Sequence, residues 1–398
     1  MTIRELKTGD TAEVVALWRY AFGAVSDAEP TEAERARYLS NYGIGAFENE
    51  TLASALLVHP LDQAVRGRIL PMGGIGGVAT FPEQRGRGHV RQLMLSTFEA
   101  MRERGQVVSM LAPFKESFYG RFGYVSAQPE VRLTTSLDGL VQWLSREVYP
   151  SNYETTRVPA IRVRERYCRA VGSMLKQYHG RAFRSDVGES EWKSRVSNRE
   201  AVILSRDGED VALFQLEKKK HEGWYSRLAI TGLYSADDRA HEAVLGFLAC
   251  HRDQIHLVDI DVGADVPAWR WFADGSEDVT LRGGKPWMVR IVDVVGALDG
   301  TKVGRPDGRL RVRVDDAQCA WNSRIYSFEA SGGTLSVRVV DGEEADAVLS
   351  IEQLSALLYG VRPAFRYRRT PDGRIDAATH SLLTGWFSSK VVRNDWYF

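Results

Sequence analysis

The fold of this chain is decided by one stretch, Val78-Ala79-Thr80-Phe81-Pro82-Glu83-Gln84-Arg85-Gly86-Arg87-Gly88-His89-Val90-Arg91. An apolar run ends at about Thr80, and Pro82 forbids further strand pairing because it has no backbone N–H. A turn that contains Gly86 and Gly88 then opens directly into a helix. The N–H groups of such a turn and of the helix N-terminus together form an anion site. The stretch therefore predicts a strand, a phosphate-binding turn and a helix.

The arginines and glycines of the turn favour a diphosphate as the anion. Arg85, Arg87 and Arg91 bring positive charge to the place where it would sit, and the two glycines let the backbone approach it without a Cβ. Arg-Gly-Arg-Gly alone also occurs in RNA-binding tails and in plain surface loops, but its place between a strand and a helix favours the anion site. Neither the dinucleotide pattern G-x-G-x-x-G nor the Gly-Lys-Ser/Thr of a P-loop is present in the turn.

The residues on both sides of this stretch indicate a mixed α/β layer over the first ~145 residues. Apolar residues at 90, 93, 94, 98 and 101 form a helical stripe after the turn. Glycines between 73 and 77 interrupt the preceding strand, 68–80, and mark a bulge or a close backbone approach. The other expected elements are strands at 3–6, 42–48, 52–59 and 107–111, a helix with the apolar face Val14, Val15, Leu17, Trp18 and Phe22, and a helix from Thr31, whose Glu34 completes a capping box.

Two further units follow along the chain. From about 149 to 284 the order of helix, strands, helix and strand repeats that of the first unit, which suggests a diverged internal repeat. From 287 onward, strands at 309–314, 325–328, 335–339 and 348–351 and helices at 351–359 and 377–387 indicate an α+β domain. The expected fold class is α+β, with domains at 1–146, 147–286 and 287–398.

Composition limits the classes of function. Lys+Arg and Asp+Glu both total 52, so no basic surplus points to nucleic acid and no global charge draws the chain to a membrane. The three cysteines lie far apart with neither disulfide nor metal-ligand spacing, so we expect reduced thiols and no metal. We find neither a signal peptide nor an apolar run of the ~20 residues that a membrane span needs. We therefore expect a cytoplasmic protein.

The turn resembles the acetyl-CoA signature of the GNAT acetyltransferases, [R/Q]-x-x-G-x-[G/A]. Arg85 and Gly88 match the signature, whereas Val90 stands where a small residue is usual. The resemblance implies that acetyl-CoA is the acyl donor and that Arg85 belongs to its site. The further implied contacts are Val78, Ala79 and Thr80 with the pantetheine arm, Gly86, Arg87, Gly88, His89, Val90 and Arg91 with the pyrophosphate, and Phe114 and Lys115 at the border of the cofactor.

A second stretch, Phe118-Tyr119-Gly120-Arg121-Phe122-Gly123-Tyr124, is similar to the F-Y-x-x-x-G-[F/Y] element of the same family. In that family the first tyrosine protonates the departing CoA thiolate, and the resemblance places this role on Tyr119. The chemistry is reasonable, because a phenol with a pKa near ~10 is protonated at neutral pH and can donate. Tyr124 is expected only to pack in the core.

Over its whole length the chain resembles the Eis-type (enhanced intracellular survival) acetyltransferases, which have a GNAT unit, a second GNAT-like unit and a sterol-carrier-like C-terminal domain. Here the second unit carries Asp237 and Asp238 where its cofactor turn would lie, and these carboxylates would repel a pyrophosphate. The resemblance implies a homohexamer and a general base that is the C-terminal carboxylate, here of Phe398. Since a carboxylate with a pKa near ~3.5 is a weak base, it needs partial desolvation or a water relay.

The acceptor is expected to be a small-molecule amine. Trp18, Phe22, Asp27 and Glu29 fall where GNAT proteins usually build the acceptor pocket, and aromatic and acidic groups suit a polycation. Core aromatics and solvated acids are the other interpretation of these residues. The resemblance to the Eis-type aminoglycoside acetyltransferases implies acetyl transfer to primary amines of an aminoglycoside-like polyamine. Two alternatives stay open: acetylation of lysine Nε in proteins or peptides, and a lipid-binding module in which the GNAT unit is regulatory.

Overall fold

The computed structural model describes residues 1–23, 28–39, 41–145, 147–220, 226–263, 271–272, 279–342, 344–361 and 376–394. The chain forms two compact units. The first joins residues 1–127 to residues 286–392, and the second comprises residues 128–285 together with Arg393 and Asn394. Neither unit is therefore one continuous stretch of sequence.

The N-terminal part of the first unit has the expected α/β element order. Its elements are β1 (Thr2–Glu5), α1 (Thr11–Phe22), α2 (Glu32–Leu39), β2 (Tyr42–Glu48), β3 (Thr51–Val65), β4 (Arg68–Thr80), α3 (His89–Glu103), β5 (Val108–Leu111) and α4 (Glu116–Gly120). Strands β1 to β4 pair antiparallel in sequence order. β4 then pairs parallel with β5, and β13 (Thr280–Ile291) pairs antiparallel with β5 on its other side.

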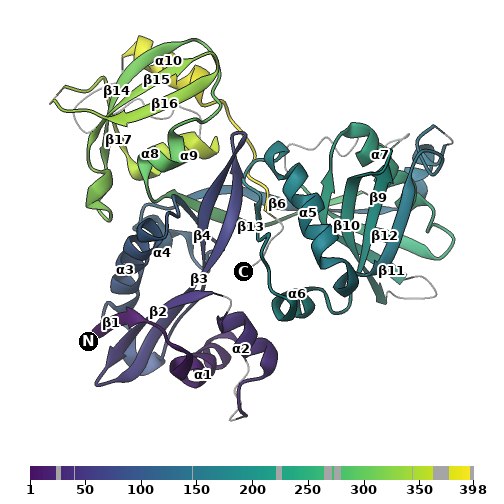
Figure 1. Ribbon diagram of the computed structural model, residues 1–398, viewed down its shortest axis with the longest axis horizontal. Coiled ribbons are helices and arrows are strands. Elements are labelled where there is room, and N and C mark those ends of the chain that lie inside the picture. The colour runs from purple at the N-terminus through teal and green to yellow at the C-terminus, as the bar shows by residue number, and fades with distance from the viewer. Residues whose placement is uncertain are drawn as a thin grey trace. The chain divides into compact units, whose positions relative to one another are not determined.

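Helices cover both faces of this sheet, with α3 on one face and α1 on the other (Figure 1). The side chains of β3 show why, because successive residues of a strand point to opposite faces. Leu56 packs in a buried cluster with Phe98 of α3, whereas Leu57 packs in a second cluster with Leu17 of α1. Both faces of β3 are therefore apolar, and each is buried by a helix.

Local signals set the ends of α1 and α2. α1 ends at Gly23, whose φ of 101° is the left-handed conformation that closes many helices. α2 begins with the expected capping box: the Thr31 hydroxyl accepts from the Glu34 N–H at 3.3 Å, and the Glu34 carboxylate accepts from the Thr31 N–H at 2.8 Å. Arg19 of α1 donates to the same carboxylate at 2.8 Å, which joins the two helices.

The second unit repeats the plan of the first. Its elements are β6 (Val125–Ser136), β7 (Glu154–Pro159), α5 (Arg164–Met174), β8 (Ala182–Phe183), α6 (Glu189–Val196), β9 (Glu200–Arg206), β10 (Glu209–Lys220), β11 (Ser226–Ser235), α7 (Asp238–Ala249) and β12 (Ile255–Val262). β9, β10 and β11 pair antiparallel in sequence order, and β11 pairs parallel with β12, as β4 does with β5. The internal repeat expected from element order is present in the fold.

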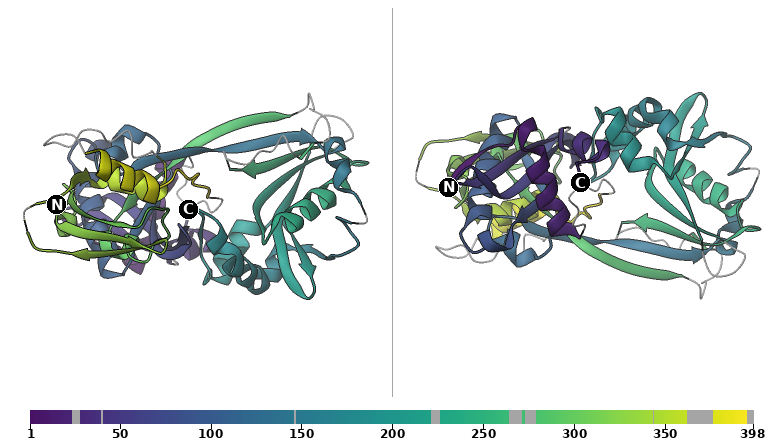
Figure 2. Two further views of the ribbon diagram at one scale, coloured as in Figure 1. Left: turned by 90° about the horizontal axis from the view of Figure 1, so that it is seen from above. Right: turned by 90° about the horizontal axis from the view of Figure 1, so that it is seen from below.

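Two long strands that the sequence did not indicate carry the chain between the units. β6 leaves the first unit and pairs antiparallel with β12 through Val131–Ser136. β13 returns and pairs with β5 through Met288–Ile291. The two strands are neighbours in strand order and are visible as long ribbons in Figure 2. The sheet of the first unit is thus completed by a strand that follows the second unit in sequence.

The C-terminal part of the first unit is a separate four-stranded sheet with strand order β16-β15-β14-β17. Its elements are α8 (Val294–Leu298), β14 (Gly308–Asp315), β15 (Ile325–Ser331), β16 (Thr334–Val339), β17 (Ala347–Ser350), α9 (Ile351–Tyr359) and α10 (Ala377–Trp386). The alternation expected in β14 is present, because Leu310, Val312 and Val314 are buried. This part is the expected α+β domain.

Buried polar contacts join the C-terminal sheet to the N-terminal part of the same unit. Arg66 donates to the carbonyl oxygens of Leu358 at 2.6 Å, Leu357 at 2.9 Å and Ser388 at 2.8 Å. The Tyr359 hydroxyl donates to Gln63 Oε1 at 2.6 Å. Because Arg66, Gln63 and Tyr359 are all buried, the two parts share one interior.

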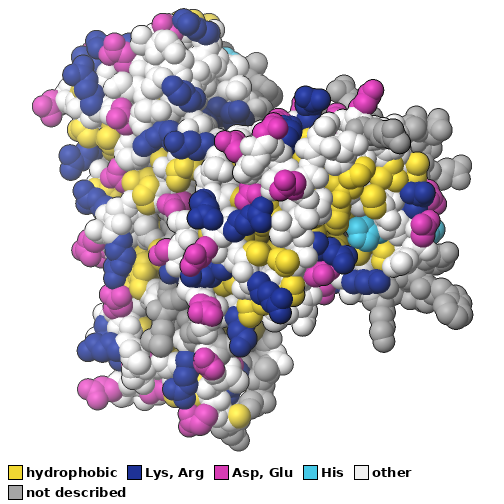
Figure 3. All heavy atoms as spheres, turned by 45° about the vertical axis from the view of Figure 1, so that its right-hand side comes forward, with side chains coloured by type: hydrophobic (Ala, Val, Ile, Leu, Met, Phe, Trp, Pro, Cys, Tyr) yellow, Lys and Arg dark blue, Asp and Glu magenta, His cyan; other side chains and the backbone are white. Residues whose placement is uncertain are grey.

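The surface carries charge of both signs. Lys, Arg, Asp and Glu side chains are interspersed on the face shown in Figure 3, in keeping with their equal totals. Within the described residues, every helix is too short or too polar to span a bilayer.

Candidate active site

A notch between β4 and β5 is the first feature of the site. The two strands pair only over Met72–Ile75 and Val108–Leu111. β4 continues along β3 to Thr80, so among the described residues no strand covers its β5-side edge beyond Ile75. An open strand edge offers N–H and C=O groups to an extended ligand. Val78, Ala79 and Thr80, the residues expected to contact the pantetheine arm, lie on this edge.

A bulge lies at the start of the notch. The register between β3 and β4 shifts between Ala55 and Leu57, which bends β4. Gly77 in the bulge has a φ of +61°, a left-handed conformation that favours glycine. The Trp18 indole N–H donates to the Gly77 carbonyl oxygen at 2.6 Å, and a Cβ on Gly77 would lie 2.9 Å from that nitrogen. The glycine cluster therefore provides both the bulge and the close approach predicted from sequence.

The turn before α3 is the second feature. Gly86 and Gly88 have left-handed φ values of 76° and 84°, and a Cβ on either would meet no atom within 4 Å. The backbone conformation, rather than crowding, requires glycine at both positions. α3 begins at His89, and no side chain caps its N-terminus. The N–H groups of its first turn therefore remain available to an anion.

Positive charge surrounds this turn. Arg85, Arg87 and Arg91 are exposed, and no ion pair with another described residue neutralises them. The Arg85 Nε lies 3.4 Å from the Thr80 carbonyl oxygen, at the end of the open edge. Free guanidinium groups beside an uncapped helix N-terminus suit a diphosphate. The residues present thus fit the diphosphate of coenzyme A.

The side chains of His89 and Val90 point away from the turn that is expected to bind phosphate. The His89 side chain is buried, with Nδ1 3.0 Å from the Met1 sulfur and Nε2 3.8 Å from a Glu48 carboxylate oxygen. Val90 packs against the core cluster of α3. Since both side chains are turned into the protein, only their backbone N–H groups can serve a phosphate.

Tyr119 of α4 lies beside the notch. The residue is 3% exposed, and burial raises the pKa of its phenol to about 12. Its ring packs edge-on against those of Phe118 and Tyr124, at centroid distances of 5.1 and 6.3 Å. No hydrogen bond joins its hydroxyl to another described residue. Tyr119 is therefore a neutral phenol with a hydroxyl available to a ligand.

Tyr124 has a different role, as expected. Its hydroxyl lies 2.7 Å from Ser109 Oγ, and Ser109 in turn donates to the Gly73 carbonyl oxygen at 2.8 Å. Burial raises the pKa of Tyr124 well above its ordinary value. Tyr124 is thus a hydrogen-bonded core residue.

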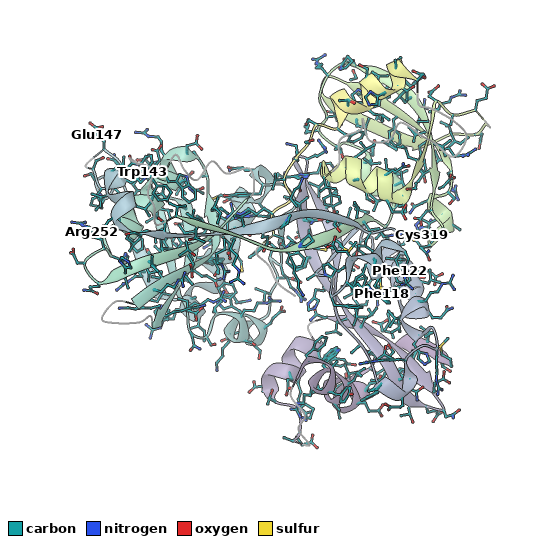
Figure 4. All side chains as sticks on the ribbon, turned by 180° about the vertical axis from the view of Figure 1, so that it is seen from behind. Phe118, Phe122, Trp143, Glu147, Arg252 and Cys319 are labelled. Atoms are coloured by element: carbon teal, nitrogen blue, oxygen red, sulfur yellow. The ribbon has the colours of Figure 1, made fainter. Side chains whose placement is uncertain are left out.

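A buried arginine fixes the chain that follows α4. Arg290 of β13 donates to the Asp316 carboxylate at 2.8 and 2.9 Å, and also to the Phe122 carbonyl oxygen. Phe118, Phe122 and Cys319 lie in one region of Figure 4; Phe122 and Cys319 belong to the buried core cluster that includes α3, and Phe118 packs against it. Sequence analysis missed Arg290 because its partners are remote in the chain and no local pattern marks them.

A cavity of about 460 Å³ opens beside Tyr119, walled by α1, α2, β3, β4 and the segment after β5. Trp18 and Phe22, two of the expected acceptor residues, line it together with Val78 of the expected cofactor strand. Phe114 also lines it, with its ring 5.6 Å from that of Tyr119. Lys115 is the residue before α4 and is exposed.

The charges of this cavity are balanced. Arg19 donates to Glu34 through Nε at 2.9 Å and Nη2 at 2.8 Å, and this contact lowers the pKa of Glu34 to about 2. Both residues line the cavity, although the sequence indicated Glu34 only as a helix cap. His59 of β3 is a further lining residue, 1% exposed, that no sequence signal singled out.

Of the two expected acidic residues, Glu29 does not contribute to this wall. Glu29 is exposed, pairs with Arg35 at 3.2 Å and is not among the lining residues, because its position on the segment before α2 directs it to solvent. Asp27 and Phe398 lie outside the described residues.

The second unit has the same bulge as the first. The register between β10 and β11 shifts between Leu213 and Gln215, and Gly232 in the bulge has a φ of +61°. The Tyr167 hydroxyl of α5 donates to the Gly232 carbonyl oxygen at 3.2 Å. An aromatic side chain thus binds the bulged carbonyl in both units.

In the second unit α7, the helix that corresponds to α3, has a capped N-terminus. Asp237 caps α7 by accepting from the Ala240 N–H at 2.7 Å, and it pairs with Arg206 at 2.6 Å. These contacts lower the pKa of Asp237, so it stays charged at neutral pH. A carboxylate already occupies the place where a pyrophosphate would bind.

Comparisons with known proteins agree with this geometry. Residues 2–127 match the acetyltransferase (GNAT) domain family, and residues 294–389 match the sterol carrier protein domain family. A Streptomyces avermitilis protein described as an uncharacterized N-acetyltransferase is 26% identical over 394 residues, which cover 94% of this chain and 93% of that protein. A second protein of that description from the same organism is 28% identical over 84% of this chain and 87% of its own.

Solved structures share the fold of the whole chain. A GCN5-related N-acetyltransferase from Anabaena variabilis matches with a TM-score of 0.84 and 18% identity over 100% of both chains. Eis1 from Mycobacterium abscessus matches with a TM-score of 0.79 and 16% identity over 99% of this chain and 100% of its own.

Residues 2–127 therefore form a GNAT acetyltransferase domain, and the chain is an acetyl-CoA-dependent N-acetyltransferase. Its fold, with a second unit that repeats the first and a C-terminal sterol carrier protein domain, is shared over the whole chain with Eis1. The GNAT acetyltransferase domain, the C-terminal sterol carrier protein domain and the α+β fold class expected from the sequence are thereby confirmed.

Proposed function

We propose that this enzyme acetylates the primary amine of a small molecule held in the cavity beside Tyr119. The observation that carries the proposal is that the edge of β4 borders this cavity together with Tyr119 and the aromatic side chains of Trp18 and Phe22. Acetyl-CoA bound along the edge of β4 and an amine bound between the rings of Trp18 and Phe22 would both lie close to the hydroxyl of Tyr119. Positioning of this kind can supply a large part of a rate enhancement.

The residues that would hold the donor follow from the notch and the turn. Backbone groups of Val78, Ala79 and Thr80 would pair with the pantetheine arm. The first-turn N–H groups of α3 and the side chains of Arg85, Arg87 and Arg91 would hold the diphosphate. Acetyl-CoA supplies the acetyl group as an activated thioester.

The proposed role of Tyr119 is to supply a proton to the leaving sulfur. The amine nitrogen bonds to the acetyl carbon, the C–S bond breaks, the amine loses a proton and the sulfur gains one. A pKa of about 12 keeps Tyr119 protonated to supply that proton. Because a thiol has a pKa near ~8.5, full transfer from Tyr119 in the resting state would cost about 5 kcal/mol. Tyr119 therefore donates a hydrogen bond that stabilises the negative charge developing on the sulfur as the C–S bond breaks, and the proton moves to the sulfur as that bond breaks.

The proton that leaves the amine needs a base. The proposed base is the C-terminal carboxylate of Phe398, supported by the fold that this chain shares with Eis1. An oligomer, a hexamer by the same resemblance, is proposed as well, and light scattering on the purified enzyme tests it.

The cavity is compatible with two classes of acceptor amine. An aminoglycoside-like polyamine is supported by the rings of Trp18 and Phe22, because aromatic faces attract cations. Among the described lining residues only Glu34 carries negative charge, and Arg19 neutralises it. An aromatic or aliphatic monoamine is therefore the competing acceptor.

A thiol-release assay tests the proposal. The purified enzyme is given acetyl-CoA with an aminoglycoside, an aromatic monoamine or a lysine peptide in turn. We expect release above the hydrolysis background with one of the two small-molecule classes. Release with the peptide alone would transfer the function to protein acetylation, and background release with every amine would refute amine acetylation.

A further inference from the structure

The second unit contains a pocket of about 240 Å³ that corresponds to the acceptor cavity of the first. Both lie where a helix crosses the bulged strand: Trp18 of α1 binds Gly77 of β4 in the first unit, and Tyr167 of α5 binds Gly232 of β11 in the second. Gly232 and Tyr167 both line the pocket. The repeat has therefore kept the acceptor pocket in a unit whose cofactor site is closed by Asp237.

Aromatic rings form the walls of this pocket. Tyr167 and Trp192 are buried, and their ring centroids lie 5.3 Å apart. The Trp192 indole N–H donates to the Ala160 carbonyl oxygen at 3.0 Å, and the Tyr167 hydroxyl is bound to Gly232. Because both polar atoms are engaged, the walls offer ring surface, which favours a planar apolar ligand.

Arg199 gives the pocket a positive charge. Its Nη1 donates to Gln215 Oε1 at 2.9 Å and to Thr231 Oγ1 at 3.2 Å, and both partners are neutral. No ion pair joins Arg199 to a carboxylate of the described chain, and its Nε and Nη2 make no hydrogen bond there. These two nitrogens form the edge of a guanidinium that matches a carboxylate with two parallel hydrogen bonds.

The neighbouring charges do not cancel that of Arg199. Arg195 also lines the pocket, but it pairs with Glu191 at 2.8 Å. The second oxygen of Glu191 pairs with Arg184 at 3.2 Å, and Arg184 also pairs with Asp186 at 3.0 Å, so these two carboxylates balance Arg184 and Arg195 and leave none for Arg199. The charge of Arg199 is thus left in excess, unlike that of Arg19 in the first unit, which Glu34 neutralises.

We infer that this pocket binds a small organic anion, a carboxylate carried on a single aromatic ring. The ring would lie against Tyr167 and Trp192, and the carboxylate would bind Nε and Nη2 of Arg199. The volume of the pocket is below the ~300 Å³ at which sites for drug-sized ligands begin, so one ring is the expected size.

Isothermal titration calorimetry of the full chain with benzoate and phenylacetate tests this inference. We expect binding of both carboxylates and binding of benzamide and benzylamine that is weaker by about tenfold or more, because a charge-assisted bidentate contact is lost. Equal affinity for benzoate and benzamide would overturn the role of charge. Absence of heat with either carboxylate at 10 mM would overturn the site.

Variants locate the binding. Arg199→Gln is expected to weaken benzoate binding by about tenfold or more. Arg199→Lys is expected to weaken it by less, because lysine keeps the positive charge and loses only the planar edge of the guanidinium. Arg19→Gln, the matched change in the cavity of the first unit, is expected to leave benzoate affinity unchanged, and so is saturation with coenzyme A. The opposite pattern would assign the ligand to the first unit and overturn the inference.

Thermal unfolding of each variant separates lost binding from lost structure. If Arg199→Gln does not fold, Thr231→Val is the substitute test. It removes one hydrogen-bond acceptor from Arg199 with little change of shape, and it is expected to weaken benzoate binding by about threefold. Unchanged affinity in a folded Thr231→Val together with unchanged affinity in Arg199→Lys would refute the site. The titrations need no turnover, so their failure leaves the proposed acetyl transfer standing.

Discussion

Arg290 and Asp316 form an ion pair at 2.8 Å in which neither side chain is exposed to solvent. Arg290 lies on β13, the strand that completes the GNAT sheet, and Asp316 follows β14 of the sterol-carrier-like domain. Arg290 also donates to the carbonyl oxygen of Phe122, three residues beyond Tyr119. The C-terminal domain is therefore linked through Arg290 to the segment directly after the helix that carries the proposed catalytic phenol.

Loss of Asp316 should destabilise the enzyme strongly. Asp316→Ala leaves the Arg290 guanidinium buried without its counter-charge, and we expect a loss of about 3–5 kcal/mol in the free energy of unfolding. The neighbouring Asp315 is half exposed and lies 3.7 Å from Arg313, so Asp315→Ala should cost at most about 0.5 kcal/mol. Urea denaturation measures both, and equal losses would contradict a special role for the buried pair.

Tyr119→Phe should impair the chemical step. The change removes the proposed hydrogen bond to the leaving sulfur, and we expect kcat to fall about 100-fold or more while the Kd of acetyl-CoA changes less than about twofold. Tyr124→Phe is the control on the adjacent ring. It removes one of the two hydrogen-bond partners of Ser109, which keeps its bond to the Gly73 carbonyl oxygen, and should cost about 1 kcal/mol of stability while kcat is retained. Similar kcat values for the two variants would remove Tyr119 from the reaction.

The pH dependence of kcat should show no ionisation of Tyr119 in the ordinary range. Its pKa of about 12 lies above the usual ~10, so the folded enzyme keeps this proton where a free phenol loses it. Activity that depends on the protonated form is complete below that value and is lost only as the pH rises through about 12. We expect a flat profile between pH 8 and 10. A descending limb there that Tyr119→Phe abolishes would contradict the assignment.

Charge reversal in the turn should weaken donor binding. Arg87 is exposed and unpaired among the described residues, so Arg87→Glu replaces an attraction for the diphosphate by a repulsion. We expect the Kd of coenzyme A to rise about tenfold or more at low salt, with a smaller ratio at high salt because ions screen the contact. Arg305→Glu is the control, since Arg305 is an exposed arginine outside the site. Calorimetry that gives the same Kd for wild type and Arg87→Glu would refute the turn as a diphosphate site.

The features that sequence analysis predicted correctly are local. The turn at Gly86 and Gly88 that opens into α3 and the capping box of Thr31 and Glu34 depend on residues within one turn of each other, so spacing alone identifies them. The strand interrupted at Gly77 is of the same kind, because the bulge needs a residue that tolerates its φ.

The features that it missed depend on distant partners. An alternating pattern tells which face of a strand is buried but not which strand lies beside it, so the pairing of Met288 with Leu111 left no local signal. His89 stands at the start of α3, and only its neighbours Met1 and Glu48, from another part of the chain, decide that its ring is buried. The buried position of Arg290 could not be predicted for the same reason, because its partners Asp316 and Phe122 are distant in sequence.

The proposed base gives the last prediction. One glycine added after Phe398 moves the terminal carboxylate by up to about 3.5 Å, and a misplacement of this size should lower kcat about 100-fold without changing the Kd of acetyl-CoA. Phe398→Leu keeps the carboxylate at the same position in the chain and changes only the side chain, so most of the activity should remain. Wild-type turnover by the extended protein would exclude the carboxylate as the base. Equal losses in the two variants would mean that the aromatic ring, not the carboxylate, is what the reaction requires at this end of the chain.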